Sequence, residues 1–515
     1  MEAMRAIIRT DVVNKVLETN GGIPTPALIE SLLLEYRPEL KRLEELYDRF
    51  LAEDLPIEGK VVQNKNWSNY KLKTNLEGHI IRLYTGFMNP YATSYSFPST
   101  PENKDVNDRL SRWARMNTIE AKDAETLQLS AACGLSYICV DQADQRLYNL
   151  KPFEMIPIYQ VNPERLDYAL RFYQVYMYET DTSGKLTRKL IQKFEWYSPD
   201  WIIYYERQGE KDQQAITELK RIPNLLKVCP IVMVRFNSEM KSNYENVKEM
   251  CDAYRDVLST FVDEGVNIKW AILKFLGLAQ PDSIQKDSNG ETEQDRFVRM
   301  LKDAFSLFIP PTGQTGSVNI EWLSKQLPKD IIEFLLDKLH EQILIQSETF
   351  DPDSPNVGKV VSNISGVGMD YKLLSMTSKC LLAKTYFLSG MREVMRIVIS
   401  AWNIIMNSKY DPYDIDIVMN FNKPVDRLTE IQILAQGKGI LSQKTLLSNS
   451  LIVKDVNAEI LQLKAEQTDS INFYTDLDKQ SVKLDNQMSE EELKTIAGKQ
   501  APENSSLGSN EPEIM

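Results

Sequence analysis

Two long amphipathic stretches without proline constrain the fold of this chain more than any other feature. One predicted helix covers residues 243–276 and the other covers residues 365–408. A typical globular helix has about 11–12 residues, so both are far longer than ordinary domain packing needs. A short predicted helix opening at Pro328 and the loop Phe350-Asp351-Pro352-Asp353-Ser354-Pro355 lie between them. The pattern predicts an antiparallel helical stalk with a small module at one end, an arrangement that suits a subunit of a ring-forming molecular machine.

Length and net charge limit the domain organisation and the functions that this chain can have. A chain of 515 residues is expected to contain several subdomains, because single cores stop growing near about 250–300 residues. The net charge of -13 and the pI near 5.0 argue against a protein that grips nucleic acid by neutralising phosphates. The same values are compatible with a protein that nucleic acid slides past without being held.

Cysteine and histidine usage predicts neither a disulfide framework nor a metal site. The five cysteines form no CxxC pair, and only two histidines are present. The N-terminus lacks the basic and apolar regions of a signal peptide, and no apolar window approaches a membrane span of about 18 residues. We therefore expect a chain made in a reducing compartment, with no cofactor, no metal and no membrane partner.

The order of patterns predicts an α+β fold that is mainly helical. Residues 1–133 show helical periodicity in three places, 27–36, 40–52 and 106–133. Segments rich in β-branched and aromatic residues follow, separated by turns, without regular βαβ alternation. The predicted strands are 137–141, 168–178, 190–197, 201–205, 231–236 and 414–421. After about residue 469 the chain is polar and acidic, so a disordered tail is expected.

Enzyme signatures are absent or incomplete. Gly358-Lys359 resembles the end of a phosphate-binding loop, but Asp353 replaces the first glycine and Val360 follows the lysine. His340-Glu341 has no second histidine at helical spacing, and no acidic pair stands out as a catalytic couple. The sequence predicts a protein that is not an enzyme.

Acidic residues recur at helical spacing in both arms of the predicted stalk. The first row is Glu245, Glu249, Asp252 and Asp256, and the second is Asp330, Glu333, Asp337 and Glu341. Spacings of three and four keep each row on one helical face. Each row is either a solvated face or the lining of a channel that repels phosphates.

Six motifs in collinear order resemble the portal proteins of tailed double-stranded-DNA bacteriophages, of the siphovirus type. They are Asn64-Lys65 with His79-Ile80-Ile81-Arg82-Leu83-Tyr84-Thr85-Gly86-Phe87, Gly134-Leu135-Ser136-Tyr137-Ile138-Cys139-Val140-Asp141, Cys229-Pro230-Ile231-Val232-Met233-Val234-Arg235-Phe236-Asn237, Asp252-Ala253-Tyr254 with Ser259, Ser365-Gly366-Val367-Gly368-Met369-Asp370-Tyr371-Lys372, and Gly437-Lys438-Gly439-Ile440-Leu441-Ser442-Gln443-Lys444-Thr445. The resemblance covers about residues 60–467.

The resemblance implies a division of the chain into the parts of a portal subunit. The parts are N-terminal helices and an α+β wing (1–243), a first stem helix (244–276), a clip (277–327), a second stem helix (328–348), a tunnel loop (349–368), a spine helix with a returning wing strand (369–423), a helical crown (424–468) and the tail (469–515). It also implies a twelve-subunit ring at one capsid vertex, assembled in the host cytoplasm, through which DNA is packaged and ejected. The implied partners are the terminase large subunit, a head-tail adaptor, scaffold protein and major capsid protein.

Two sets of candidate site residues follow from the resemblance. The tunnel loop would face DNA through Asp351, Asp353, Gly358, Lys359, Val360, Ser362 and Asn363, and the channel would be lined by Asp330, Glu333, Asp337 and Glu341. A mobile loop is expected because the residues before Pro352 and Pro355 avoid helical dihedrals. An ordinary connector between two helices is the alternative.

Two further expectations concern assembly. A stripe on the second long helix is predicted to need a partner beyond its own domain. The stripe consists of Leu373, Cys380, Phe387, Met391, Val394, Val398, Trp402 and Ile405. The insertion 277–327 is predicted to be a docking module, with a disordered surface insertion as the alternative. A self-assembling scaffold without a DNA channel, and a nucleotide- or metal-dependent enzyme, remain the competing interpretations of the whole chain.

Overall fold

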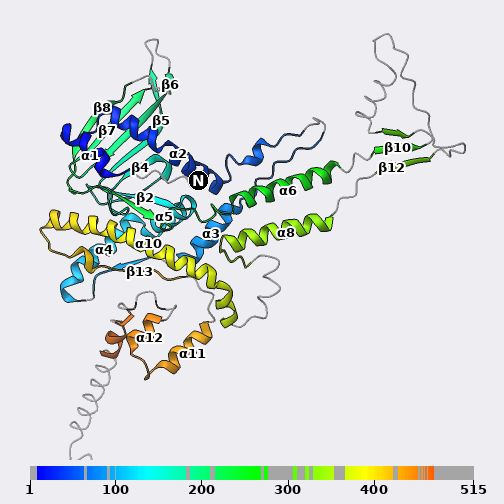
Figure 1. The fold of residues 1–515 in the computed structure, drawn as a ribbon. Helices are drawn as coiled ribbons and strands as arrows, with labels where there is room; N and C mark the ends of the chain where they lie inside the picture. Colours follow the sequence, from blue (N-terminus) through cyan, green and yellow to red (C-terminus); the bar gives the residue numbers. More distant parts are fainter. Residues whose placement is uncertain are drawn as a thin grey trace, which may run out of the picture. The chain divides into compact units, whose positions relative to one another are not determined.

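A computed structural model describes most of the chain. The described residues are 8–62, 67–89, 93–98, 100–180, 186–208, 215–267, 272–276, 306–309, 319–323, 329–352, 366–421, 427–449, 453, 456, 459–460 and 462–468. The chain divides into two compact units, Met1–Pro424 and Val425–Met515. The mixture of helices and sheets confirms the predicted α+β class (Figure 1).

The N-terminal helices differ from the prediction in where they break. The helices are α1 (Thr10–Thr19), α2 (Pro26–Leu51), η1 (Pro56–Gly59), α3 (Leu76–Met88), η2 (Pro101–Asn103), α4 (Lys104–Asn117) and α5 (Ile119–Cys133). The two predicted helices at 27–36 and 40–52 form the single helix α2, which continues through Pro38. The predicted helix 106–133 is two helices, because Thr118 adopts a left-handed conformation with φ of 46°.

Strands β2, β5, β6, β7, β9 and β13 lie where the β-branched and aromatic segments predicted them, whereas β1, β3, β4 and β8 were not predicted. Five strands form an antiparallel sheet in the order β4-β5-β6-β7-β8, and three more form the order β3-β2-β9. Their bounds are β2 (Leu135–Val140), β3 (Leu147–Leu150), β4 (Met155–Ile158, after η3, Pro152–Glu154), β5 (Tyr168–Thr180), β6 (Leu186–Tyr197), β7 (Trp201–Gln208), β8 (Thr217–Pro223) and β9 (Ile231–Arg235). A short strand, β1 (Ser94–Ser96), pairs with β13 (Asp416–Val418), which is the core of the strand predicted at 414–421.

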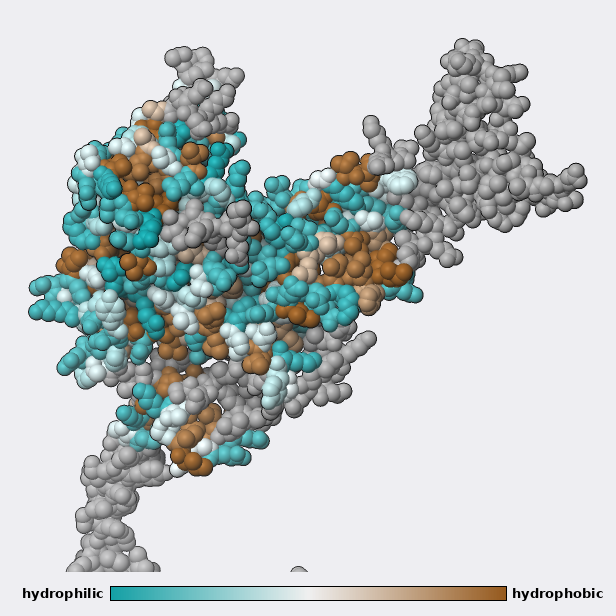
Figure 2. Space-filling view, viewed as in Figure 1, coloured by the Kyte–Doolittle hydropathy of each residue, from teal (hydrophilic) through white to brown (hydrophobic). Residues whose placement is uncertain are grey.

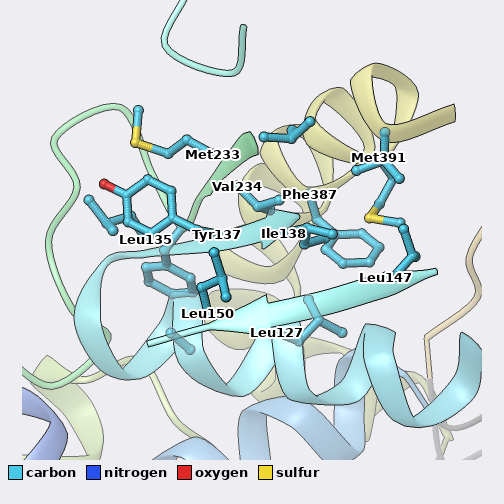
Figure 3. Packing of buried hydrophobic residues seen from close by; sticks show 14 of the residues in the cluster. Leu127, Leu135, Tyr137, Ile138, Leu147, Leu150, Met233, Val234, Phe387 and Met391 are labelled. Carbon is cyan, nitrogen blue, oxygen red and sulfur yellow. The ribbon is translucent and has the colours of Figure 1, made fainter. Parts of the chain in front are cut away.

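The core of the first unit is the three-stranded sheet between two helices (Figure 3). Leu127 of α5 lies on one side of the sheet, and Phe387 and Met391 of α10 (Gly366–Met406) lie on the other. All six residues of β2 are buried, which explains why its sequence is apolar on both faces apart from Ser136. Gly390 fits this packing because a Cβ atom there would lie 2.7 Å from Val234.

The stripe predicted on the second long helix is covered by its own chain. Leu373, Cys380, Phe387, Met391, Val394, Val398 and Trp402 are buried, whereas Ile405 is exposed. The prediction that this stripe needs another subunit was therefore wrong, since β9, β2 and η4 (Pro412–Asp414) pack against α10. The exposed apolar residues of α10 lie on other faces and include Leu374, Leu381 and Leu382.

Gly134 links α5 to β2 at a position where only glycine fits. Its φ of 88° lies in the left-handed region, and a Cβ atom would lie 2.0 Å from the carbonyl oxygen of Met240. The backbone of Phe236 also donates a hydrogen bond to the Gly134 carbonyl at 2.9 Å. The start of the central strand is thus held against the segment that leads into the stalk.

The stalk is shorter than predicted on its first arm. Helix α6 spans Lys248–Asn267 and helix α8 spans Lys329–Gln346; we call this pair the stem. The predicted helix 243–276 was too long, because residues Ile272–Leu276 form strand β10. This apolar segment pairs with β11 (Ser306–Ile309) and β12 (Asn319–Leu323), and sheet pairing prevails over helical periodicity there. The described parts of the predicted clip, 277–327, are β11 and β12.

The second unit contains α11 (Arg427–Gly437) and α12 (Gln443–Asn449), as the short helices of the predicted crown require. Ser442 precedes α12, and its Oγ accepts a hydrogen bond from the Thr445 backbone N–H at 3.2 Å. The Ser-x-x-Thr part of the C-terminal motif is therefore a helix cap. The predicted tail, 469–515, lies outside the described residues.

Asp123 makes the stability of the first unit depend on pH. Its side chain is buried, Tyr95 Oη donates to it at 3.0 Å, and burial raises the pKa of this carboxyl group to about 7. Because one pKa unit corresponds to about 1.4 kcal/mol, ionising Asp123 in the folded state costs about 4 kcal/mol. Because the pKa is raised in the folded state, the protonated Asp123 favours folding fully below about pH 4, and this contribution to the free energy of unfolding is lost as the pH rises to about 7.

We expect Asp123→Asn to remove this pH dependence. Asparagine can still accept the hydrogen bond from Tyr95 but cannot ionise, so the variant should be more stable than the wild type at pH 8 and no more stable at pH 4. Urea unfolding at both pH values measures the difference. Asp108→Asn, at an exposed position of α4, is the control. An equal effect of Asp123→Asn at both pH values would contradict the assignment.

Candidate functional site: the stem and its surfaces

The two stem helices pack against each other along one side of α8. The rings of Tyr254 on α6 and His340 on α8 lie 6.4 Å apart. The less exposed positions of α8 recur at spacings of four, three and four, as expected for the face that packs inward. They are Ile332, Leu336, Leu339 and Ile343. This contact fixes the rotation of α8 about its own axis and so decides what its other faces present.

The acidic row of α8 is exposed. Asp330, Glu333 and Asp337 are exposed and Glu341 is half-buried, as the spacing predicts for one outward face. Lys329 pairs with Glu333 at 3.4 Å, and Lys338 pairs with Glu341 at 2.6 Å. Asp330 and Asp337 form no ion pair with another described residue, so they carry the uncompensated charge of this face.

A third face of α8 is apolar and also exposed (Figure 2). Ile331, Phe334 and Leu335 have exposed fractions of 68%, 64% and 42% near the start of the helix. Ile345 continues this face towards the other end, with Lys338 and Gln342 between. Sequence inspection did not single out this face, although the spacing of the three residues was visible. Exposed apolar clusters on a protein surface commonly mark a contact with another molecule.

The first acidic row begins at Glu245, in the turn before α6, and continues on that helix; two of its members have a different role from both interpretations that the sequence left open. Glu245 accepts from Arg42 at 3.0 Å, and Asp252 accepts from Arg49 at 2.8 Å. Both arginines lie on α2, and the seven-residue spacing of the arginines matches that of the two acids. These carboxylates therefore fix the stem to the body, and only Glu249 and Asp256 of the row remain exposed.

A fully buried ion pair joins α6 to α3. Arg255 Nη2 contacts Glu77 Oε2, and neither side chain is exposed to solvent. Arg49 Nη1 reaches the same carboxylate at 3.4 Å. Burial raises the pKa of Glu77, and the charge of Arg255 opposes that rise. The base of the stem is thus held by a charged network inside the protein.

A segment that begins with η1 and is otherwise without helix or strand, which we call the strap (residues 56–62 and 67–74), runs along α6. The Asp263 carboxylate accepts from Lys60 Nζ and from the Tyr70 backbone N–H, each at 2.7 Å. Ser259 Oγ accepts from the Leu72 backbone N–H at 3.1 Å, and Arg255 Nε donates to the Thr74 carbonyl at 3.0 Å. Residues one turn apart on α6 therefore hold the strap along its length, which no sequence pattern indicated.

The structure revises one residue of the predicted tunnel loop. Asp351 is buried, and its Oδ2 lies 2.9 Å from His79 Nε2. The prediction that Asp351 faces DNA does not agree with this position, because α3 brings His79 against the loop where α8 has ended. The other predicted loop residues, Asp353, Gly358, Lys359, Val360, Ser362 and Asn363, lie outside the described residues.

The described residues contain no group of three or more His, Cys, Asp or Glu side chains that could hold a metal ion. All five cysteines are free and buried, and burial raises the pKa of the Cys133 thiol to about 12. In this part of the chain none of the helices is both long enough and apolar enough to cross a membrane.

Comparisons with known proteins match most of the chain. The family described as phage portal protein, SPP1 Gp6-like, matches residues 30–472. The portal protein of Bacillus phage SPP1 is 22% identical over 360 residues, which cover 66% of this chain and 66% of that protein. This match spans just under two thirds of the curated relative. A chain in the neck of an empty GTA particle aligns with a TM-score of 0.32 and 12% identity, covering 72% of this chain and 87% of that chain.

Proposed function

The chain belongs to the SPP1 Gp6-like family of phage portal proteins, and from this membership we propose that it forms a closed ring at one capsid vertex. DNA would enter the capsid during packaging and leave it during ejection through the channel of this ring. Portal proteins are structural, so we propose no catalytic role. The wing, stem, clip, tunnel loop, spine and crown predicted above are the proposed parts of the subunit, with the clip starting at β10.

The arrangement of α8 is the observation that carries the proposal. At about 100° per residue, the acidic row lies roughly a third of a turn around the helix from Ile331, Phe334 and Leu335. A subunit in a ring needs one face for its neighbour and another for the channel, and α8 offers two distinct exposed surfaces. A scaffold without a DNA channel would need the apolar face but gives no reason for the acidic one.

The charge of the proposed lining suits a duplex that must move. A channel wall that attracted phosphates would release counterions on contact and hold the DNA. Asp330 and Asp337 would repel the backbone instead, and the overall charge of -13 acts in the same sense. The terminase large subunit and the head-tail adaptor would bind at the clip, and scaffold and capsid proteins at the wing.

The first test is the shape of the assembled protein. Negative-stain microscopy of the purified chain should show rings with a hole wide enough for duplex DNA, and native mass spectrometry should count about twelve subunits, as the symmetry of a closed ring allows. A stable monomer at micromolar concentration would contradict the proposal. Hydrolysis of nucleotides by the purified rings would favour the enzyme interpretation.

A second test addresses the channel. Rings of the double variant Asp330→Lys/Asp337→Lys should bind linear duplex DNA roughly tenfold or more tightly than wild-type rings, with affinity that falls steeply as salt rises. Electrophoretic mobility shifts at low and high salt measure this. The matched control, Glu35→Lys/Glu44→Lys, changes the same charge at exposed positions of α2. If both variants bind DNA equally well, the acidic row does not line the channel.

A further inference from the structure

The strap exposes apolar side chains although its backbone is fixed. The exposed fractions of Val61, Trp67 and Tyr70 are 86%, 49% and 45%. The Tyr70 backbone N–H is at the same time bound to Asp263 of α6. A segment whose backbone is held in place while its aromatic rings stay partly exposed is suited to contact another molecule, since ordering the contact costs little additional entropy.

The strap and α8 lie on opposite sides of α6. The strap is bound through Ser259 and Asp263, whereas α8 contacts Tyr254. Tyr254 precedes Asp263 by nine residues, which corresponds to about two and a half helical turns and therefore to the opposite face. Figure 1 shows the same order, with α6 between the strap and α8. The strap, α6 and α8 thus form three layers, with the exposed apolar side chains of the strap on one side of α6 and the exposed apolar face of α8 on the other.

Two different apolar surfaces on opposite sides favour a head-to-tail contact. A twofold dimer would pair each surface with itself, whereas a head-to-tail contact pairs one with the other and repeats until a ring closes. The charges agree with this pairing. Two of the three lysines of the described strap already pair with carboxylates of their own chain, Lys60 with Asp263 and Lys73 with Glu58. Lys71, beside Tyr70, donates to the Glu58 backbone carbonyl, so its charge is available to a carboxylate at the border of the apolar face of α8.

We propose that the strap of each subunit covers the Ile331, Phe334 and Leu335 face of α8 on the next subunit. The occupant of both surfaces is therefore a second copy of this chain. This inference rests on the proposed ring and adds the pair of surfaces that joins its subunits. It also gives the strap its role, because the bonds to Asp263 and Ser259 hold Trp67 and Tyr70 ready for the neighbouring α8.

Thiol cross-linking between two single variants tests the pairing. All native cysteines are buried, so introduced thiols react against a low background. Rings assembled from an equal mixture of Tyr70→Cys and Phe334→Cys chains are treated with a short bis-maleimide. Cross-linked dimers should be the main product on denaturing gels, and the chain carrying both cysteines should give a ladder up to the full ring. The control mixture replaces Tyr70→Cys by Leu34→Cys, an exposed position on α2.

The outcomes separate this inference from the proposed function. Native mass spectrometry on the same samples shows whether rings are present. Rings that cross-link no better than the control mixture would overturn the strap contact and leave the portal assignment standing. Absence of rings in the wild-type protein would overturn both.

Discussion

Ile331→Asp combined with Phe334→Asp is expected to leave the protein folded but unable to form rings. Both side chains are exposed in the single chain, so the substitutions remove little internal packing. In the proposed interface each carboxylate would lose its hydration, at a cost of several kcal/mol. Since about 1.4 kcal/mol is a tenfold change in affinity, subunit association should weaken by roughly a thousandfold or more. Light scattering at micromolar concentration should then find monomers.

The matched control adds a carboxylate to the same helix on a different side. Lys329 is 69% exposed and lies about 160° around α8 from Ile331. Lys329→Asp should therefore assemble as the wild type does. Circular dichroism should show unchanged helix content in both proteins. Intact rings from the double variant would mean that α8 does not contribute to the contact between subunits.

The sequence predicted the strands and helices whose patterns are local. These include β2, in which Ser136 is the one polar residue, and the paired strands β5 and β6. The shorter strands β1, β3, β4 and β8 and the three strands β10–β12 were not predicted. Helix ends were harder to predict. Residues 272–276 form β10 because partners from two distant segments pair with them, and nothing within the segment reveals those partners. The break at Thr118 depends in the same way on tertiary packing that overrides helical propensity.

The candidate site was predicted in part. The acidic row of α8 was found from its spacing, but the equally regular row that begins at Glu245 and continues on α6 was misinterpreted for Glu245 and Asp252. Periodicity shows that charges share a face and not what that face meets. The matching spacing of Arg42 and Arg49 was the available signal. The strap had no comparable signal, because its bonds to α6 involve backbone groups that every sequence possesses.

Arg255→Ala is expected to destabilise the first unit by about 3–5 kcal/mol, the usual result of removing one partner of a buried ion pair. Arg255 also donates to Asp252 at 2.9 Å and to the Thr74 carbonyl at 3.0 Å, so its loss weakens the stem and the strap together. The free energy of unfolding in urea measures the effect on the monomeric Ile331→Asp/Phe334→Asp background. Lys338→Ala, which breaks an exposed pair, should cost no more than about 1 kcal/mol.

The Glu77 carboxylate, which remains buried in Arg255→Ala, makes the stability of this variant depend on pH. Glu77 already has a raised pKa because it is buried, and without Arg255 only Arg49 is left to oppose that rise. A carboxyl group whose pKa is raised in the folded state favours folding at low pH, and this contribution is lost as the pH rises. The loss of unfolding free energy caused by Arg255→Ala should therefore be smaller near pH 4 than at pH 8. Adding Glu77→Gln should recover part of the loss at pH 8, since no unpaired charge is then buried. A penalty that is equal at both pH values and unaffected by Glu77→Gln would show that packing, and not charge, is what Arg255 supplies.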